Sequence, residues 1–173
     1  MAITFYEASV ATYLQTLNAL TGVLAKGAAH FQEKGIDPAS IVETKFAPDM
    51  LPFAFQVQSA VHHSKNALEA MKKGVFTPPA QTPALSYAQW QGEVAGAIEA
   101  LKKITPDEAN ALEKNDVVFE FRSMKMPFTA PGFLFSFSLP NFFFHTTTAY
   151  DILRSKGVPL GKRDFMGALR MKT

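Results

Sequence analysis

Asn141 and His145 lie four residues apart in the run Leu-Pro-Asn-Phe-Phe-Phe-His over residues 139–145, the densest aromatic stretch of the chain. Residues at i and i+4 share one face of an α-helix, about 6 Å apart along its axis. An amide and an imidazole placed in this way can contact one ion or one ordered water molecule. The stretch is therefore the first place where side chains could carry chemistry.

His63 belongs to a second polar row, on another expected helix. Gln56, Ala60, His63 and Ala67 recur at steps of four, three and four residues, which places them on one helical face. Small and polar residues in such a row can line a pocket. They are equally typical of a close contact between two helices, so both interpretations stay open.

The other candidate side chains give weaker indications. His30 lies near a helix end and His62 falls opposite an apolar stripe, so both are expected at the surface. Ser64 and His63 are adjacent and cannot face each other on a helix, which excludes a dyad. The chain has no Cys, and this excludes disulfides, thiolate metal sites and a cysteine nucleophile.

Four long helices are expected to position these residues, over about 5–34, 52–73, 86–104 and 132–156, because apolar residues recur there at steps of three and four. Ser86 and Thr105 each begin a capping-box pattern, and short helical turns are expected at 38–43 and 105–112. Pro140 should kink the fourth long helix. Alternation over 117–129 predicts a two-stranded hairpin, and residues 75–85 resemble a proline-rich loop.

The expected fold class is all-α: a four-helix bundle with a small β-hairpin before the fourth helix. A length of 173 residues indicates a single domain over 1–173 with a substantial core. Sixteen Phe, seven of them between 128 and 144, are more than one such core needs. Phe143 is assigned to the core. Phenylalanine side chains that the core cannot hold would form an apolar surface patch, which predicts a homodimer.

Charge and hydropathy argue against nucleic acid and membranes as binding partners. The net charge is +2 with scattered Lys and Arg, unlike the basic stripe of a nucleic-acid-binding protein. The N-terminus lacks the basic region of a secretory signal, and the apolar run 131–144 is too short to span a membrane. We expect a cytoplasmic protein with no nucleic-acid or membrane partner.

Several motifs together resemble an uncharacterised bacterial domain-of-unknown-function family, itself similar to the DinB/YfiT-like superfamily of four-helix bundles. They are residues 47–50, His63, the run at 139–145, residues 147–154 and Leu-Gly-Lys-Arg-Asp-Phe at 160–165. The resemblance covers essentially the whole chain. It implies a DinB-like bundle, often dimeric, without an established activity.

The superfamily resemblance also implies a metal site. It aligns His63, Asn141 and His145 with three histidines that hold a divalent ion in the superfamily. Asn141 departs from that pattern, and an amide oxygen is a weaker ligand than imidazole for zinc or nickel. We expect no cofactor in protein as purified, and weak binding of a supplied zinc or nickel ion.

Two classes of function follow from these observations. The residues form either a pocket for a small molecule or metal, or a buried polar cluster in a dimeric, non-enzymatic protein. The absence of a charged group beside the histidines favours the second slightly. A divalent-metal-dependent enzyme of the DinB/YfiT-like type, with a degenerate His/Asn/His site, is the alternative.

Overall fold

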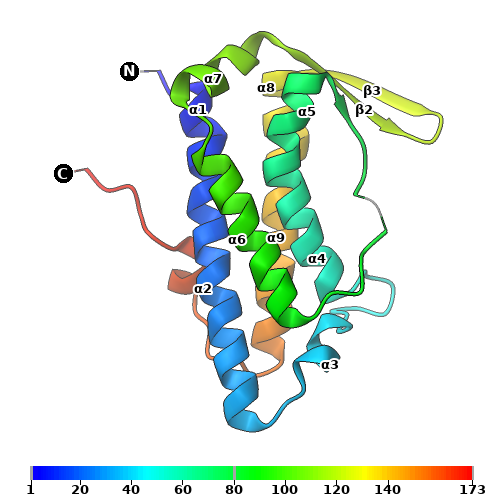
Figure 1. Cartoon of the computed structure of the whole chain (residues 1–173), viewed down its shortest axis with the longest axis vertical. Helices are drawn as coiled ribbons and strands as arrows, with labels where there is room; N and C mark the ends of the chain where they lie inside the picture. The colour runs from blue at the N-terminus through cyan, green and yellow to red at the C-terminus, as the bar shows by residue number, and fades with distance from the viewer. Residues whose placement is uncertain (1, 80, 173) are drawn as a thin grey trace.

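The computed structural model describes residues 2–79 and 81–172. Most of them are helical, and the long helices lie side by side along the longest axis of the molecule (Figure 1). In chain order the elements are α1 (Phe5–Ala8), α2 (Val10–Lys34), α3 (Pro38–Val42), α4 (Phe53–Val61), the π-turn η1 (His62–Asn66), α5 (Ala67–Lys73), β1 (Val75–Phe76), α6 (Tyr87–Lys102), α7 (Pro106–Ala111), the 3₁₀ turn η2 (Leu112–Lys114), β2 (Asp116–Phe121), β3 (Met124–Thr129), α8 (Ala130–Phe133), the π-turn η3 (Leu134–Ser138), α9 (Leu139–Ser155) and α10 (Lys162–Met166).

The helix ends follow the capping chemistry of the sequence. Ser86 and Thr105 accept hydrogen bonds from backbone N–H groups three residues on, completing the capping boxes expected at α6 and α7. Gly35 ends α2 with φ of 63°, a left-handed conformation that favours glycine. The expected helix over 5–34 is present but is divided at Ser9, whose backbone leaves the helical region.

Two long helical segments contain a π-turn that the sequence did not predict. The π-turn η1 joins α4 to α5, and η3 joins α8 to α9. At the end of η3 the Leu139 N–H donates to the Leu134 carbonyl, five residues back. The irregularity expected at Pro140 therefore lies in the preceding turn, and Pro140 itself occupies the first turn of α9, where its missing N–H costs little.

A small three-stranded sheet accompanies the mostly helical fold. The strands β2 and β3 pair antiparallel, with Phe121 opposite Met124 across a two-residue connection. The strand β1 pairs parallel with β2 and extends the sheet to three strands in the order β1-β2-β3. Residues 75–76, expected to be loop, are thus a strand: the Val118 N–H donates to the Gly74 carbonyl as α5 ends, which brings the chain alongside β2.

The long helices pack through apolar faces. The helix α4 lies against α9, and α2 against α6 (Figure 1). In the second contact Tyr87 of α6 donates a hydrogen bond to the Leu24 carbonyl of α2 at 2.9 Å. The Tyr87 ring also stacks on Phe53 of α4. A β-carbon on Gly27 would lie 2.4 Å from the Tyr87 hydroxyl oxygen, so a residue without a side chain is required there.

The aromatic residues of the last long helix divide between core and surface. Phe142 is fully buried, with its ring edge-on to Tyr13 at 5.0 Å between centroids. Phe135, Phe143 and Phe144 are exposed by 57%, 38% and 57%. The assignment of Phe143 to the core is therefore wrong, because it lies about 100° around the helix from Phe142, which takes the inward direction.

The C-terminal segment folds back onto α2. Phe165 in α10 meets Tyr150 edge-on, at 5.9 Å between ring centroids, and Lys26 of α2 forms a salt bridge with Asp164 at 2.7 Å. An aromatic contact and a salt bridge therefore hold this segment against the bundle. Across the described residues, no helix combines the length and hydropathy needed to cross a membrane.

Candidate functional site

The structure brings His63 and His145 together between η1 and α9. Their ring centroids lie 6.0 Å apart, and the ring planes differ by 18°. The two residues are 82 positions apart in the chain, so their meeting depends on the packing of α4 and η1 against α9. The structure thus brings together two of the three predicted site residues, one from each helix.

Gln56 fixes the orientation and the tautomer of His145. The Gln56 side-chain N–H group donates to the Leu51 carbonyl at 2.8 Å, which turns its amide oxygen toward α9. His145 Nδ1 lies 2.8 Å from that oxygen, so Nδ1 carries the proton and donates. His145 Nε2 consequently holds a lone pair, and it has no hydrogen-bond partner among the described residues. A fixed imidazole with one free nitrogen is the arrangement of a ligand or acceptor.

His63 is the most deeply buried member of the pair. Its side chain is 6% exposed, and its ring lies 5.2 Å from that of Phe76 and 5.7 Å from that of Phe137. Within residues 2–79 and 81–172, the buried Nδ1 has no hydrogen-bond partner. An unpaired buried nitrogen costs on the order of 1–3 kcal/mol, and such a group calls for a bound partner or a functional role.

Both imidazoles are neutral at ordinary pH. Burial lowers the pKa of His63 to about 3, and the charges of His62 and His145 add to the effect. Burial also lowers the pKa of His145 to about 4. The site therefore presents nitrogen lone pairs rather than positive charge.

Asn141 is on the same helix but is tied to its own backbone. Its side-chain N–H group donates to the Phe137 carbonyl at 2.7 Å. This bond leaves the amide oxygen as the atom that could act as a ligand. The structure places Asn141 one turn before His145, as the spacing predicted, and Gln56 rather than Asn141 contacts the imidazole.

A buried chain of hydroxyl groups holds the π-turn that carries His63. Ser138 at the end of η3 donates to the His63 carbonyl at 2.7 Å. Ser138 Oγ lies 2.8 Å from the Tyr13 hydroxyl, which must donate because Ser138 has already used its proton. Hydrogen bonds thus link α2, η3 and η1, through Tyr13, Ser138 and the His63 carbonyl in turn. π-Turns recur at functional sites in proteins, and here two of them meet beside His63.

His62 is more enclosed than the sequence suggested. It is half-buried; its Nδ1 accepts from the Asn66 side chain at 3.0 Å, and its Nε2 donates to the Thr77 carbonyl at 2.7 Å. The expected surface position holds in part, because Thr77, which follows β1, covers this side of η1. Both nitrogens are satisfied, which gives His62 a structural role.

Gln56 is the site residue that sequence reasoning did not select. It is buried and lies two helical turns before His63 in the polar row of the second long helix. Its place in that row was the available indication. A glutamine is a weaker metal ligand than a histidine or a carboxylate, so the sequence did not single it out. Its role is seen only in the structure, from its contact with His145.

Metal-ligand chemistry at this site is limited by the donors present. Among the described residues, no group of three or more His, Cys, Asp or Glu side chains is arranged to hold a metal ion. Two imidazoles and one amide oxygen are neutral ligands. Such a set is suited to holding an ion weakly and is unlike the ligand set of a tightly bound structural metal.

Comparison with known proteins places the chain in a family. Residues 5–166 match the model of DUF1993, a domain of unknown function. The chain belongs to the DUF1993 family. A search of curated proteins found no match.

The DUF1993 chain also shares its fold with a solved structure. That structure is a DinB family member protein from Shewanella denitrificans, at 23% sequence identity and a TM-score of 0.81. The match covers 97% of this chain and 94% of the other. The DinB-like fold expected from the motifs is therefore confirmed at the level of backbone architecture.

Proposed function

We propose that this DUF1993 protein is a DinB-like four-helix bundle that binds a small ligand or a divalent metal ion between η1 and α9, and that it acts as a homodimer. The single observation that carries the binding site is the free Nε2 of His145, which Gln56 aims by holding Nδ1. The orphaned Nδ1 of the buried His63, across from it, supports the same site.

Binding is favoured over acid–base catalysis by the character of the two imidazoles. A general base works best when its pKa is near the operating pH, whereas the pKa of His145 is lowered to about 4 and that of His63 to about 3. Neutral imidazoles are suited to donating a lone pair to a metal ion or accepting a hydrogen bond from a ligand. His63, Asn141 and His145 would supply the ligands of a metal ion.

Asn141→His should tighten the binding of zinc or nickel by at least about tenfold, because an imidazole would replace an amide as third ligand. The unmodified protein should bind these ions weakly, since no negative charge offsets a dication among aromatic rings. Calorimetric titration of tag-free protein with zinc and with nickel measures both affinities.

His62→Gln is the matched control, because His62 is adjacent to His63 but has both ring nitrogens occupied. It should leave the metal affinity unchanged, and His145→Gln should abolish binding. Tight stoichiometric zinc in the unmodified protein would contradict the weak-site proposal. Equal affinities of the unmodified protein and Asn141→His would show that the three side chains do not converge on one ion.

The homodimer proposal is supported by the outer face of α9. From Ala130 to Tyr150 the sequence contains no Asp, Glu, Lys or Arg. Phe143 and Phe144 are exposed on this segment by 38% and 57%. Exposed aromatic side chains without neighbouring charge are typical of the centre of a protein–protein interface. A second copy presents the same uncharged face, so two-fold pairing brings no like charges together.

Phe144→Glu should convert the dimer to a monomer, because it places a carboxylate in an apolar contact. Light scattering coupled to size-exclusion chromatography at micromolar concentration measures the change in mass. Phe121→Glu, at an exposed aromatic in β2, should leave the mass unchanged. A monomeric unmodified protein would contradict the dimer, and dissociation by Phe121→Glu would place the interface elsewhere.

A further inference from the structure

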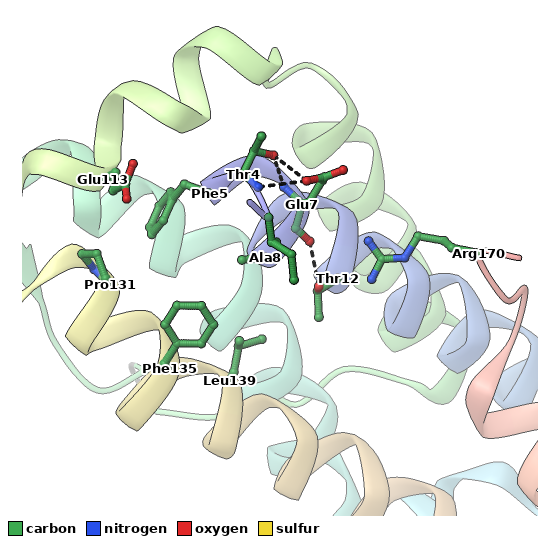
Figure 2. Close-up of a pocket in the computed structure, with 11 residues that line it drawn as sticks. Thr4, Phe5, Glu7, Ala8, Thr12, Glu113, Pro131, Phe135, Leu139 and Arg170 are labelled. Atoms are coloured by element: carbon green, nitrogen blue, oxygen red, sulfur yellow. Dashed lines mark hydrogen bonds between the residues drawn. The ribbon is translucent and has the colours of Figure 1, made fainter. Parts of the chain in front are cut away.

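A cavity of about 570 Å³ opens between α1 and the start of the last long helical segment. None of the residues that line it is His63, Asn141 or His145. Figure 2 shows its side chains arranged along a groove, with Glu113, Phe5, Pro131 and Phe135 toward one end and Arg170 at the other. This groove is large enough for a drug-sized molecule.

The middle of the groove is apolar. Phe5 and Leu139 are buried in its floor, and Phe135 is 57% exposed and offers its ring to an occupant. Ala8 of α1 completes the wall opposite Phe135 and Leu139 (Figure 2). Apolar side chains at a concave surface favour a ligand with a hydrocarbon body.

The charges at the two ends of the groove are unequal. Glu7 and Arg170 lie toward one end: hydrogen bonds from the Thr4 N–H and hydroxyl lower the pKa of Glu7, and the charge of Arg170 lowers it further. At the other end Glu113 has no ion-pair partner among the described residues. Of the described lining residues, Arg170 alone is basic. Within the described part of the chain, the carboxylate of Glu113 is therefore without an ion pair at the end of the groove where Phe5 and Phe135 lie (Figure 2).

We propose that this groove binds a hydrophobic organic cation, that is, an alkyl or aryl amine. Its ammonium group would pair with Glu113 and approach the rings of Phe5 and Phe135, whose faces attract cations. Its hydrocarbon body would cover Phe135, Leu139 and Ala8. This site is separate from the histidine pair and does not depend on the function proposed for it.

An anionic ligand fits the same groove less well. A carboxylate placed at Arg170 would lie near the ionised Glu7, and a carboxylate at the aromatic end would meet Glu113. Like charges at close range oppose binding. The charge pattern, rather than the apolar surface, is what selects an amine over a fatty acid of equal length.

Three probes with the same eight-carbon chain test this selection: n-octylamine, 1-octanol and octanoate at pH 7.5. The amine should bind about fivefold more tightly than either other probe, the gain expected from one exposed ion pair and one cation–π contact. Calorimetry gives the affinities, and amide chemical shifts should change within residues 4–12. Phe135→Ala should weaken all three probes.

Glu113→Gln should remove the preference for the amine while octanol binding is retained. Glu93→Gln makes the same change in net charge on α6, outside the groove, and should leave the preference intact. Tighter binding of octanoate than of octylamine would overturn the proposal. So would equal binding of all three probes, or an equal loss of preference in Glu93→Gln.

Discussion

Phe142→Ala is expected to lower the free energy of unfolding by about 3–5 kcal/mol, the usual cost of removing a buried phenylalanine ring. Phe142 is fully buried and meets Tyr13 edge-on. Tyr13 in turn donates to Ser138, which holds the His63 carbonyl. The cavity would therefore open beside the hydroxyl chain that supports the site. Urea or thermal denaturation measures the loss.

Phe143→Ala is the matched control, one position along the same helix. In the monomeric Phe144→Glu background Phe143 stays 38% exposed, so its truncation there should cost about 1 kcal/mol or less. Similar losses at the two positions would mean that Phe143 is covered in solution, as the dimer proposal requires of this face. Phe144→Glu, measured in parallel as a monomer, separates these two contributions.

Acidification from pH 7 to pH 5 should lower the free energy of unfolding by about 2–4 kcal/mol through the two buried histidines. Their pKa values are about 3 for His63 and about 4 for His145 in the folded protein, and about 6.5 in an unfolded chain. Between these values the unfolded state binds more protons. The contribution of the two neutral histidines to the free energy of unfolding is thus fully present above pH 6.5 and is lost as the pH falls below it.

Urea denaturation at pH 7, 6 and 5 measures this dependence, above the range in which the carboxylates protonate. The double variant His63→Gln with His145→Gln should flatten the profile, whatever its stability at pH 7. His30→Gln, near the far end of α2, should keep the profile of the unmodified protein. A profile that stays steep in the double variant would assign the acid sensitivity to other groups.

Local chemistry made much of this fold predictable. Capping boxes at Ser86 and Thr105, the glycine after α2 and the spacing of apolar residues set the helix positions to within a few residues. Alternation over β2 and β3 indicated the change from helix to strand. Each of these features depends on residues close together in the chain.

The features that the sequence did not reveal depend on distant partners. The strand β1 is only two residues long and exists because β2, some forty positions later, accepts it. The π-turns are stabilised across helices, as the bond from Ser138 to the His63 carbonyl shows. No local pattern distinguishes such turns from regular helix.

The candidate site was predictable only in part, because local spacing places side chains on a helix face but does not decide their partners on other helices. The helical rows predicted that His63 and His145 would point toward each other, and their ring centroids lie 6.0 Å apart. The roles of Gln56 and Asn141 could not be assigned, because an amide has a donor and an acceptor end and packing decides which end faces the imidazole. In this fold Gln56 takes that position and Asn141 turns to the Phe137 carbonyl.

The π-turn η3 also restricts how this segment can vary in length. One extra residue in a helix rotates everything beyond it by about 100°. This rotation lets Phe133 face Phe76 of β1, at 5.1 Å between centroids, while Phe142 faces Tyr13 of α2 at 5.0 Å. Deleting one residue from 134–138 would restore a regular helix but turn one of these rings away from its partner. Insertions and deletions should therefore be rarer among relatives here than in the segments 77–79 and 81–85, where no helical phase has to be kept.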